Sequence, residues 1–317
     1  MHMTMNAARP FLVSLLLWAS AMPEAHAIFR AYLASDGSDA NPCTLVAPCR
    51  LLPAALAAVD NGGQIWMLDS ANYNTGTVNI AKSVSILAVP GAVGSVLAIA
   101  GPAITVSTFG VKVSLRNLVI GNLPGGGGTD GVAVNSNETT VALEECLIEN
   151  VPGRGVYATN ISKVQLVNST VRNVGDTGVF VEGGANAVVS RSRLLSNPYG
   201  VGATANVPGI TRVVVTDSLV SGGGTTGVYA YAYDMVPTAY ARAVVTGSTI
   251  EGLVTAVYAD GAGSGGLARL NLSGNTISNN SYSYYQVGGY SVIVSYGHNQ
   301  MSENTTFLGT LTTLPMQ

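Results

Sequence analysis

Short segments with apolar residues at every second position recur along most of the chain, and this alternation is typical of strands with one buried face. Seven ten-residue segments follow one scheme, with apolar residues at positions 1, 3 and 8, mostly a small or polar residue at position 6, and often Asn at position 10. They begin at residues 113, 141, 164, 187, 213, 243 and 270, and a looser copy begins at Val292. A strand-like unit that returns every 22–30 residues indicates a solenoid.

A second short strand precedes each copy of this unit from residue 141 on. It consists of Gly-Val or Ala-Val followed by two residues, in segments that begin at residues 131, 155, 178, 200, 227 and 256. Two or three short strands per repeat, separated by Gly and Asn, predict a chain that coils into a parallel β-helix, with neighbouring coils about 4.8 Å apart. We therefore expect an all-β fold, a single-stranded parallel β-helix of about nine coils.

Two positions of the repeated unit are assigned to structure. Asn at position 10 is expected in a turn column, because Asn tolerates the left-handed conformation; the column comprises Asn122, Asn150, Asn173 and Asn279. Cys146 occupies position 6, where most other copies have Ser or Asn. We expect it to be an inert interior thiol.

The chain divides into four predicted regions, which are residues 1–27, 28–63, 64–304 and 305–317. They are a signal peptide, a loop-rich lead-in, the β-helix, and a C-terminal cap or tail. The lead-in contains an apolar stripe at i, i+3, i+4 and i+7, formed by Leu52, Ala55, Leu56 and Val59. This spacing predicts a short amphipathic helix over 51–59, just before a first strand at 64–68. The helix would cap the first coil, whose core would otherwise be exposed.

The first 27 residues have the three parts of a secretory signal. Arg9 provides a positive start, residues 11–22 are apolar, and Ala25-His26-Ala27 is an A-x-A cleavage site. The apolar run is too short to span a membrane comfortably, and no later segment is long enough. We expect export to the periplasm, the cell surface or the medium, with a mature chain that starts near Ile28 and has no membrane span. An uncleaved anchor is the alternative.

The cysteines fit an exported protein. Cys43 and Cys49 flank a Pro-containing loop, and in an oxidising compartment we expect them to form a small disulfide. A metal-binding pair is the alternative, but no His lies near them in the sequence.

Composition and charge exclude several classes of function. Charged residues make up 10% of the chain, and the net charge is −3 with 14 Lys and Arg. This balance offers no basic field for a polyanion, so no nucleic-acid partner is predicted. Beyond the signal peptide the only His is His298. A His-based zinc site or a Ser-His-Asp triad therefore lacks its ligands, and no metal site is predicted. The sequence indicates no oligomeric state.

The chain resembles a known protein superfamily. The repeats, together with the segments 38–50 (SDANPCTLVAPCR), 54–59 (AALAAV), 61–73 (NGGQIWMLDSANY) and 295–300 (SYGHNQ), resemble the right-handed parallel β-helix superfamily of pectate lyases and polygalacturonases. More narrowly, they resemble secreted bacterial right-handed β-helix repeat proteins with no assigned function. The resemblance implies a right-handed helix and covers nearly all of the mature chain. The superfamily includes lyases, hydrolases, epimerases, tailspikes and adhesins, so the fold alone does not determine the activity.

The catalytic motifs of that superfamily are incomplete in this chain. Of the polygalacturonase motifs only Gly128-Thr129-Asp130-Gly131 resembles the first, and neither a pectate lyase calcium cluster nor the epimerase Asp-Pro-His-Asp is present. Aligning the companion strands on Gly-Val puts Asp130, Arg154 and Thr177 in one column, with Asp176 beside it. Asp130, Arg154 and Asp176 are therefore the candidate catalytic residues, which could grip or cleave an acidic sugar. The alternative is a solvated ion pair. No cofactor is predicted, and Ca²⁺ is a possible cofactor if the chain is a lyase.

The residue after Gly-Val or Ala-Val is aromatic in most companion strands. Inward positions of these strands are Val and Ala, so the rings should point outward, where they can stack on sugar faces while their hydroxyls find polar partners. The predicted ligand-binding residues are Tyr157, Phe180, Tyr229, Tyr231, Tyr233 and Tyr258. The alternative is a ladder of rings that pack on one another.

These patterns leave three functional hypotheses. The preferred one is an exported protein that binds polysaccharide or another cell-surface partner through its aromatic face. The second is a polysaccharide lyase or glycoside hydrolase that acts on an acidic glycan with a divergent active site. The third is a structural, adhesin-like protein.

Overall fold

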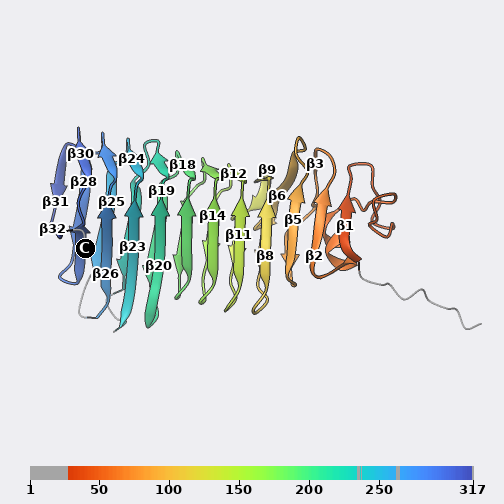
Figure 1. Cartoon of the computed structure of the whole chain (residues 1–317), viewed down its shortest axis with the longest axis horizontal. Helices are drawn as coiled ribbons and strands as arrows, with labels where there is room; N and C mark the ends of the chain where they lie inside the picture. Colours follow the sequence, from red (N-terminus) through yellow and green to blue (C-terminus); the bar gives the residue numbers. More distant parts are fainter. Residues whose placement is uncertain (1–27, 234–235, 237, 262–264, 316–317) are drawn as a thin grey trace, which may run out of the picture.

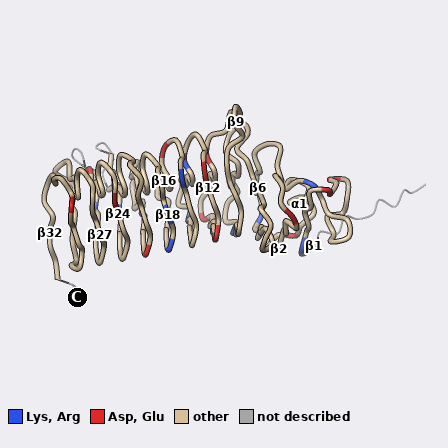
Figure 2. The backbone as a smooth tube through the Cα atoms, turned by 90° about the horizontal axis from the view of Figure 1, so that it is seen from above, with Lys and Arg blue, Asp and Glu red and all other residues tan. Residues whose placement is uncertain are grey.

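The structure is a computed structural model that describes residues 28–233, 236, 238–261 and 265–315. The chain winds into one rod, in which the strands of successive coils lie side by side along the long axis (Figure 1). Charged residues are sparse along the rod (Figure 2). The predicted signal peptide lies outside the described residues.

Three parallel sheets form the walls of the rod, and successive coils add one strand to each sheet. In the described residues, sheet I has 12 strands, which are β1 (Ile28–Leu33), β2 (Val59–Met67), β5 (Val84–Ala88), β8 (Lys112–Arg116), β11 (Thr140–Glu144), β14 (Lys163–Val167), β17 (Asn186–Ser190), β20 (Gly209–Thr216), β23 (Ala239–Thr246), β26 (Leu267–Ser273), β29 (Ser291–Ser295) and β32 (Leu311–Thr313).

Sheets II and III have ten strands each within the described residues. Sheet II contains β3 (Ala71–Asn72), β6 (Gly94–Gly101), β9 (Leu118–Gly128), β12 (Leu147–Glu149), β15 (Thr170–Arg172), β18 (Arg193–Leu195), β21 (Leu219–Ser221), β24 (Thr249–Glu251), β27 (Thr276–Ser278) and β30 (Gln300–Ser302). Sheet III contains β4 (Val78–Ile80), β7 (Ile104–Val106), β10 (Val132–Val134), β13 (Val156–Ala158), β16 (Thr177–Glu182), β19 (Tyr199–Ala205), β22 (Thr226–Ala232), β25 (Thr255–Gly261), β28 (Tyr282–Val287) and β31 (Thr306–Leu308).

The apolar periodicity of the sequence corresponds to burial in the rod. In β14, Val164 and Leu166 are buried, whereas Lys163 and Gln165, which alternate with them, are exposed. The same positions of neighbouring coils pair in register, so Val164 stacks between Val141 and Ala187. Like residues on neighbouring strands thus build one continuous core. The predicted all-β, right-handed parallel β-helix of about nine coils is confirmed.

Left-handed turns lead out of the short strands of sheet II, as the Asn column predicted. Asn150, Asn173 and Asn279 have φ angles of 58°, 53° and 56°. The prediction is wrong for Asn122, which lies inside β9 and pairs with Ala98 of β6. There the strand continues through the glycines that follow, so no turn is formed at this position.

Position 6 of the repeated unit forms a buried polar ladder between sheets I and II. The N–H of Cys146 donates to Ser169 Oγ at 3.0 Å, and the N–H of Ser169 donates to Ser192 Oγ at 3.1 Å. The ladder continues through Ser218, Ser248, Asn275 and Asn299. It satisfies buried backbone donors at the turn. Burial raises the pKa of the Cys146 thiol to about 11, so the thiol is protonated at neutral pH.

The N-terminal region contains the predicted helix and also an additional strand that was not predicted. Helix α1 (Leu52–Ala58) is present, with Leu52, Ala55 and Leu56 buried. The first strand, however, is β1 rather than a segment at 64–68, and β2 already begins at Val59. The alternating residues of β1 bury Ala31 and Leu33 against the end of the core, a short pattern that the Gly-, Pro- and Cys-rich loop after it obscures. The predicted disulfide between Cys43 and Cys49 is present, with their Cα atoms 4.6 Å apart.

The C-terminal segment, which was expected to be a cap or tail, continues the β-helix. It contributes β31 to sheet III and β32 to sheet I, beyond the boundary placed at residue 304. Within the described residues, no helix has the length and apolar character needed to cross a bilayer.

Candidate functional site

The outward face of sheet III carries two side-chain columns, and pairing between strands fixes their members. The first column runs through Asp130, Arg154, Thr177, Tyr199, Thr226, Thr255 and Tyr282. The second column runs through Ala133, Tyr157, Phe180, Gly202, Tyr229, Tyr258 and Tyr285. The alignment of the companion strands on Gly-Val therefore gives the register of the structure as far as β25.

Asp130 and Arg154 form a half-buried ion pair at the N-terminal end of the first column. Asp130 is only 6% exposed, and its Oδ1 accepts from the Arg154 backbone N–H at 2.8 Å and from Arg154 Nε at 2.9 Å. Its Oδ2 accepts from Arg154 Nη2 at 3.3 Å. The guanidinium lies over the Tyr157 ring, with Arg154 Cζ 3.7 Å from the ring centroid. Both carboxylate oxygens of Asp130 are thus engaged within the protein.

Asp176, the third candidate catalytic residue, does not join this pair directly. Its Oδ1 accepts from Thr177 Oγ1 at 3.1 Å, and no ion pair joins Asp176 to Arg154 within the described residues. Asp176 acts on Arg154 at longer range. Burial lowers the pKa of Arg154, but the hydrogen bond and the charge of Asp130, followed by the charges of Tyr157 and Asp176, outweigh burial and raise it.

Tyr157 and Phe180 pack on each other in the N-terminal part of the second column. Their rings are stacked with centroids 5.9 Å apart and an interplanar angle of 10°. The Tyr157 hydroxyl donates to Glu182 Oε1 at 2.5 Å, and Glu182 Oε2 accepts from Asn206 Nδ2 at 3.1 Å. These two rings form the packed ladder that was the alternative to a ligand-binding face.

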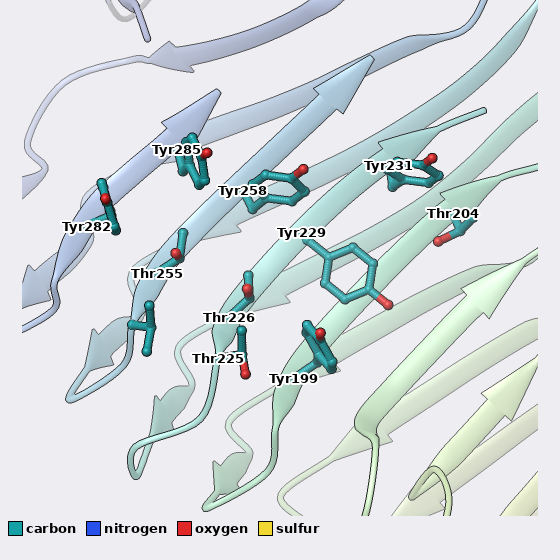
Figure 3. Close-up of a pocket in the computed structure, with 11 residues that line it drawn as sticks. Tyr199, Thr204, Thr225, Thr226, Tyr229, Tyr231, Thr255, Tyr258, Tyr282 and Tyr285 are labelled. Atoms are coloured by element: carbon teal, nitrogen blue, oxygen red, sulfur yellow. The ribbon is translucent and has the colours of Figure 1, made fainter. Parts of the chain in front are cut away.

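Gly202 interrupts the aromatic column and lets the next ring fold back across it. A Cβ atom on Gly202 would lie 2.0 Å from Tyr229 Cζ, so the ring of Tyr229 occupies the space that a side chain would fill. The Tyr229 ring centroid lies 6.4 Å from that of Phe180 and 5.8 Å from that of Tyr199. Figure 3 shows the Tyr229 ring directed toward β19 and away from Tyr258. This tilt opens a gap between Tyr229 and Tyr258.

That gap is part of a groove of about 520 Å³, which we call the tyrosine groove (Figure 3). It crosses four strands of sheet III, β19, β22, β25 and β28. It is lined by Tyr199, Thr204, Thr225, Thr226, Tyr229, Tyr231, Val254, Thr255, Tyr258, Tyr282 and Tyr285. The groove therefore combines six aromatic rings with a row of threonine hydroxyls.

The tyrosines of the groove are held by neighbouring groups. Tyr258 donates to Asp260 Oδ2 at 2.6 Å, and its ring packs edge-on against Tyr285 at 5.5 Å. Tyr285 in turn stacks on Tyr282 at 5.3 Å. Burial raises the pKa of Tyr229, and burial with the hydrogen bond to Asp260 raises that of Tyr258. Both phenols are neutral at physiological pH.

Three of the six predicted ligand-binding aromatics, Tyr229, Tyr231 and Tyr258, line the groove. Tyr157 and Phe180 lie outside it, and Tyr233 is 47% exposed and packs edge-on against Tyr231 with the centroids 5.0 Å apart. Tyr199, Tyr282, Tyr285 and the threonines also line the groove but are not among the predicted residues. Tyr199 directly precedes the Gly-Val of its strand and could have been found there. Tyr285 follows Ser283-Tyr284, which replaces Gly-Val in β28.

The part of the chain that the structure describes contains no group of three or more His, Cys, Asp or Glu that could hold a metal ion. The polar groups in and beside the groove are hydroxyls and one buried carboxylate, which suit hydrogen bonding to a neutral ligand.

The family model for the right handed beta helix region matches residues 100–240 of the chain. No curated protein matches the sequence. Solved structures do match its fold.

An alginate lyase from Paenibacillus sp. aligns with a TM-score of 0.60 at 14% identity, over 89% of this chain and 99% of that one. A rhamnogalacturonan lyase aligns with a TM-score of 0.56 at 14% identity, over 87% of this chain and 86% of that one. Pectate lyase Pel9A aligns with a TM-score of 0.53 at 15% identity, over 89% of this chain and 78% of that one. The three sheets and these comparisons together identify the chain as a right-handed parallel β-helix protein of the pectate lyase-like fold.

Proposed function

We propose that the chain is an exported protein that binds a segment of polysaccharide in the tyrosine groove and does not cleave it. The observation that carries this proposal is the groove itself, with six tyrosine rings beside threonine hydroxyls on a rigid sheet. Its volume of about 520 Å³ falls within the range of small-ligand sites.

The chemistry of the lining suits a sugar. Aromatic rings bind the apolar C–H faces of pyranoses, and phenol and threonine hydroxyls exchange hydrogen bonds with sugar hydroxyls. Tyr229, Tyr258 and Tyr285 come from consecutive coils, about 4.8 Å apart along the rod. A sugar chain laid along the rod would meet a new ring at each coil.

A buried acceptor without a hydrogen-bond partner among the described residues lies beside the groove. Asp260 is 9% exposed, and its Oδ1 is buried without a hydrogen-bond partner among the described residues. Its Oδ2 already holds Tyr258. Because an unpaired buried oxygen is costly, a ligand hydroxyl or water that reached Oδ1 would be bound favourably.

Binding is favoured over cleavage by the state of the candidate catalytic residues. A general acid or base must reach the proton that it transfers, but both oxygens of Asp130 are occupied by Arg154. Tyr229 and Tyr258 have pKa values above the ordinary value of 10.0 and would not act as bases at neutral pH. The solved structures of the same fold are named as lyases of pectate, rhamnogalacturonan and alginate, which agrees with a carbohydrate ligand.

Export belongs to the same proposal. The Cys43–Cys49 disulfide supports it, because structural disulfides persist in oxidising compartments. Expression of the full chain followed by cell fractionation, with N-terminal sequencing of the mature protein, would test it. A protein retained in the cytoplasm with residues 1–27 intact would contradict export.

Glycan-array screening followed by calorimetric titration of the best ligand would test the binding. We expect Tyr258→Ala to lower the affinity about tenfold or more, because it removes one ring of the groove. Tyr157→Ala is the matched control, since it removes a tyrosine of the same column outside the groove, and it should leave the affinity unchanged. A protein that binds no glycan, or that releases new reducing ends or unsaturated products from its ligand, would overturn the proposal.

A further inference from the structure

Three arginines lie in register on neighbouring strands of sheet I, a different wall of the rod from the tyrosine groove. They are Arg212 of β20, Arg242 of β23 and Arg269 of β26, and we call them the arginine ladder. Neighbouring strands are about 4.8 Å apart, so the three Cα atoms span about two coils. Asn186 of β17 and Lys163 of β14 continue the same column toward the N-terminus.

Among the residues that the structure describes, no carboxylate pairs with the ladder. The strands that carry and flank it, β17, β20, β23, β26 and β29, contain no Asp or Glu. Arg269 is oriented by neutral groups, since its Nε donates to Asn271 Oδ1 at 3.0 Å and its Nη2 to Tyr296 Oη at 3.1 Å. Within the described residues, the side chains of Arg212 and Arg242 are exposed and make no salt bridge. Like charges directly opposite each other on neighbouring strands repel, so the ladder favours an external anion.

The ladder surrounds a hollow of about 290 Å³. The hollow is lined by Arg212, Arg242, Val244, Arg269 and Asn271. The next outward column on the same strands is formed by Ile210, Tyr240 and Leu267 and is apolar. A ligand in this position would meet guanidinium groups with one part of its surface and apolar side chains with another.

We infer that the arginine ladder binds the carboxylate groups of an acidic polysaccharide, as a second glycan site separate from the tyrosine groove. Guanidinium groups pair with carboxylates through two parallel hydrogen bonds, and the apolar column suits the C–H face of a sugar ring. A sugar unit is about as long as the rise of one coil, so successive uronate residues could meet successive arginines. A short cationic column on a chain of net charge −3 suits a polymer with one charge per sugar better than a nucleic acid.

The test compares one polymer in two states, polygalacturonate and the same polymer with its carboxyl groups reduced to alcohols. Titrations use the full mature chain carrying Tyr258→Ala, so that the tyrosine groove contributes little. We expect the acidic polymer to bind more tightly than the reduced one, and Arg242→Gln to lower that affinity about tenfold. The binding should weaken as salt is added.

Arg193→Gln, the same change on an exposed arginine of sheet II, is the matched control and should leave the affinity unchanged. Arg212→Gln repeats the test if Arg242→Gln lowers the thermal stability. Equal binding of the acidic and reduced polymers would overturn the inference, as would full affinity in the ladder variants. Tighter binding of a DNA oligonucleotide than of polygalacturonate, lost in the same variants, would also overturn it by identifying a phosphate site.

Discussion

Gly202 offers the sharpest test of how the tyrosine groove is formed. Its backbone is not in the left-handed region, so Gly202→Ala imposes no conformational cost of its own. The new Cβ, however, would lie 2.0 Å from Tyr229 Cζ and 2.3 Å from its Oη, against 3.4 Å or more in ordinary contact. The ring of Tyr229 must therefore swing away from β19, toward Tyr258 and into the groove.

The energetic cost of this movement is limited. Tyr229 would lose its ring contacts with Phe180 and Tyr199, each worth about 0.5–1.5 kcal/mol. Replacing Gly by Ala returns about 0.4–1 kcal/mol through the unfolded chain. We expect a net destabilisation of about 0–2.6 kcal/mol in chemical denaturation, which leaves the rod folded. The affinity for a groove ligand should fall about tenfold or more, because the gap between Tyr229 and Tyr258 closes.

Gly76→Ala is the matched control for this experiment. A Cβ at Gly76 would meet no atom within 4 Å, and the residue is far from the groove in sequence. Calorimetric titration of both variants with the same glycan, together with their denaturation curves, separates the two effects. Undiminished glycan affinity in a folded Gly202→Ala protein would show that Tyr229 does not control the groove.

Three further outcomes follow from the structure. Asp130→Asn should lower the free energy of unfolding by about 1–3 kcal/mol in denaturant titrations, because it breaks a half-buried ion pair, while leaving glycan binding unchanged; Asp176→Asn should cost less than about 0.5 kcal/mol. Equal losses from the two changes would contradict the structural role of Asp130. Cys146 should react with a thiol reagent at pH 8 only after denaturation, and fast labelling of the native protein would contradict its burial. The raised pKa values of Tyr229 and Tyr258 favour the neutral phenols in the folded state, so their contribution to stability should be constant up to about pH 10 and be lost above it; equal alkaline loss of stability in the chain and in a Tyr229→Phe, Tyr258→Phe variant would contradict this.

The sequence determined the architecture because each repeat carries the same pattern. Val164 and Leu166 lie inward as their alternation required, and Tyr157, Phe180 and Tyr229 share a column because Gly-Val marks the same register in each coil. Where a companion strand lacks Gly-Val or Ala-Val, the alignment could not assign its residues to a column. Ser283 and Tyr284 replace Gly-Val in β28, so the tyrosines of that strand were not selected.

The groove depended on features that periodicity does not carry. The four aromatic residues that follow Gly-Val or Ala-Val look equivalent in the alignment, yet Tyr157 and Phe180 stack while Tyr229 and Tyr258 separate. The difference comes from the missing side chain at Gly202, which changes the direction of one ring on the neighbouring strand. Likewise, the pairing of Asp130 with Arg154 was expected from the column, but the burial of Asp130 depends on the turn packed around it.

Binding in the tyrosine groove can be observed in a crystal structure of the protein with an oligosaccharide selected by glycan-array screening. We expect an intact oligosaccharide along sheet III, with one sugar ring between Tyr229 and Tyr258 and hydroxyl contacts to Thr226 or Thr255. A cleaved oligosaccharide, or one bound over Asp130 and Arg154 with the tyrosine groove empty, would contradict the proposal.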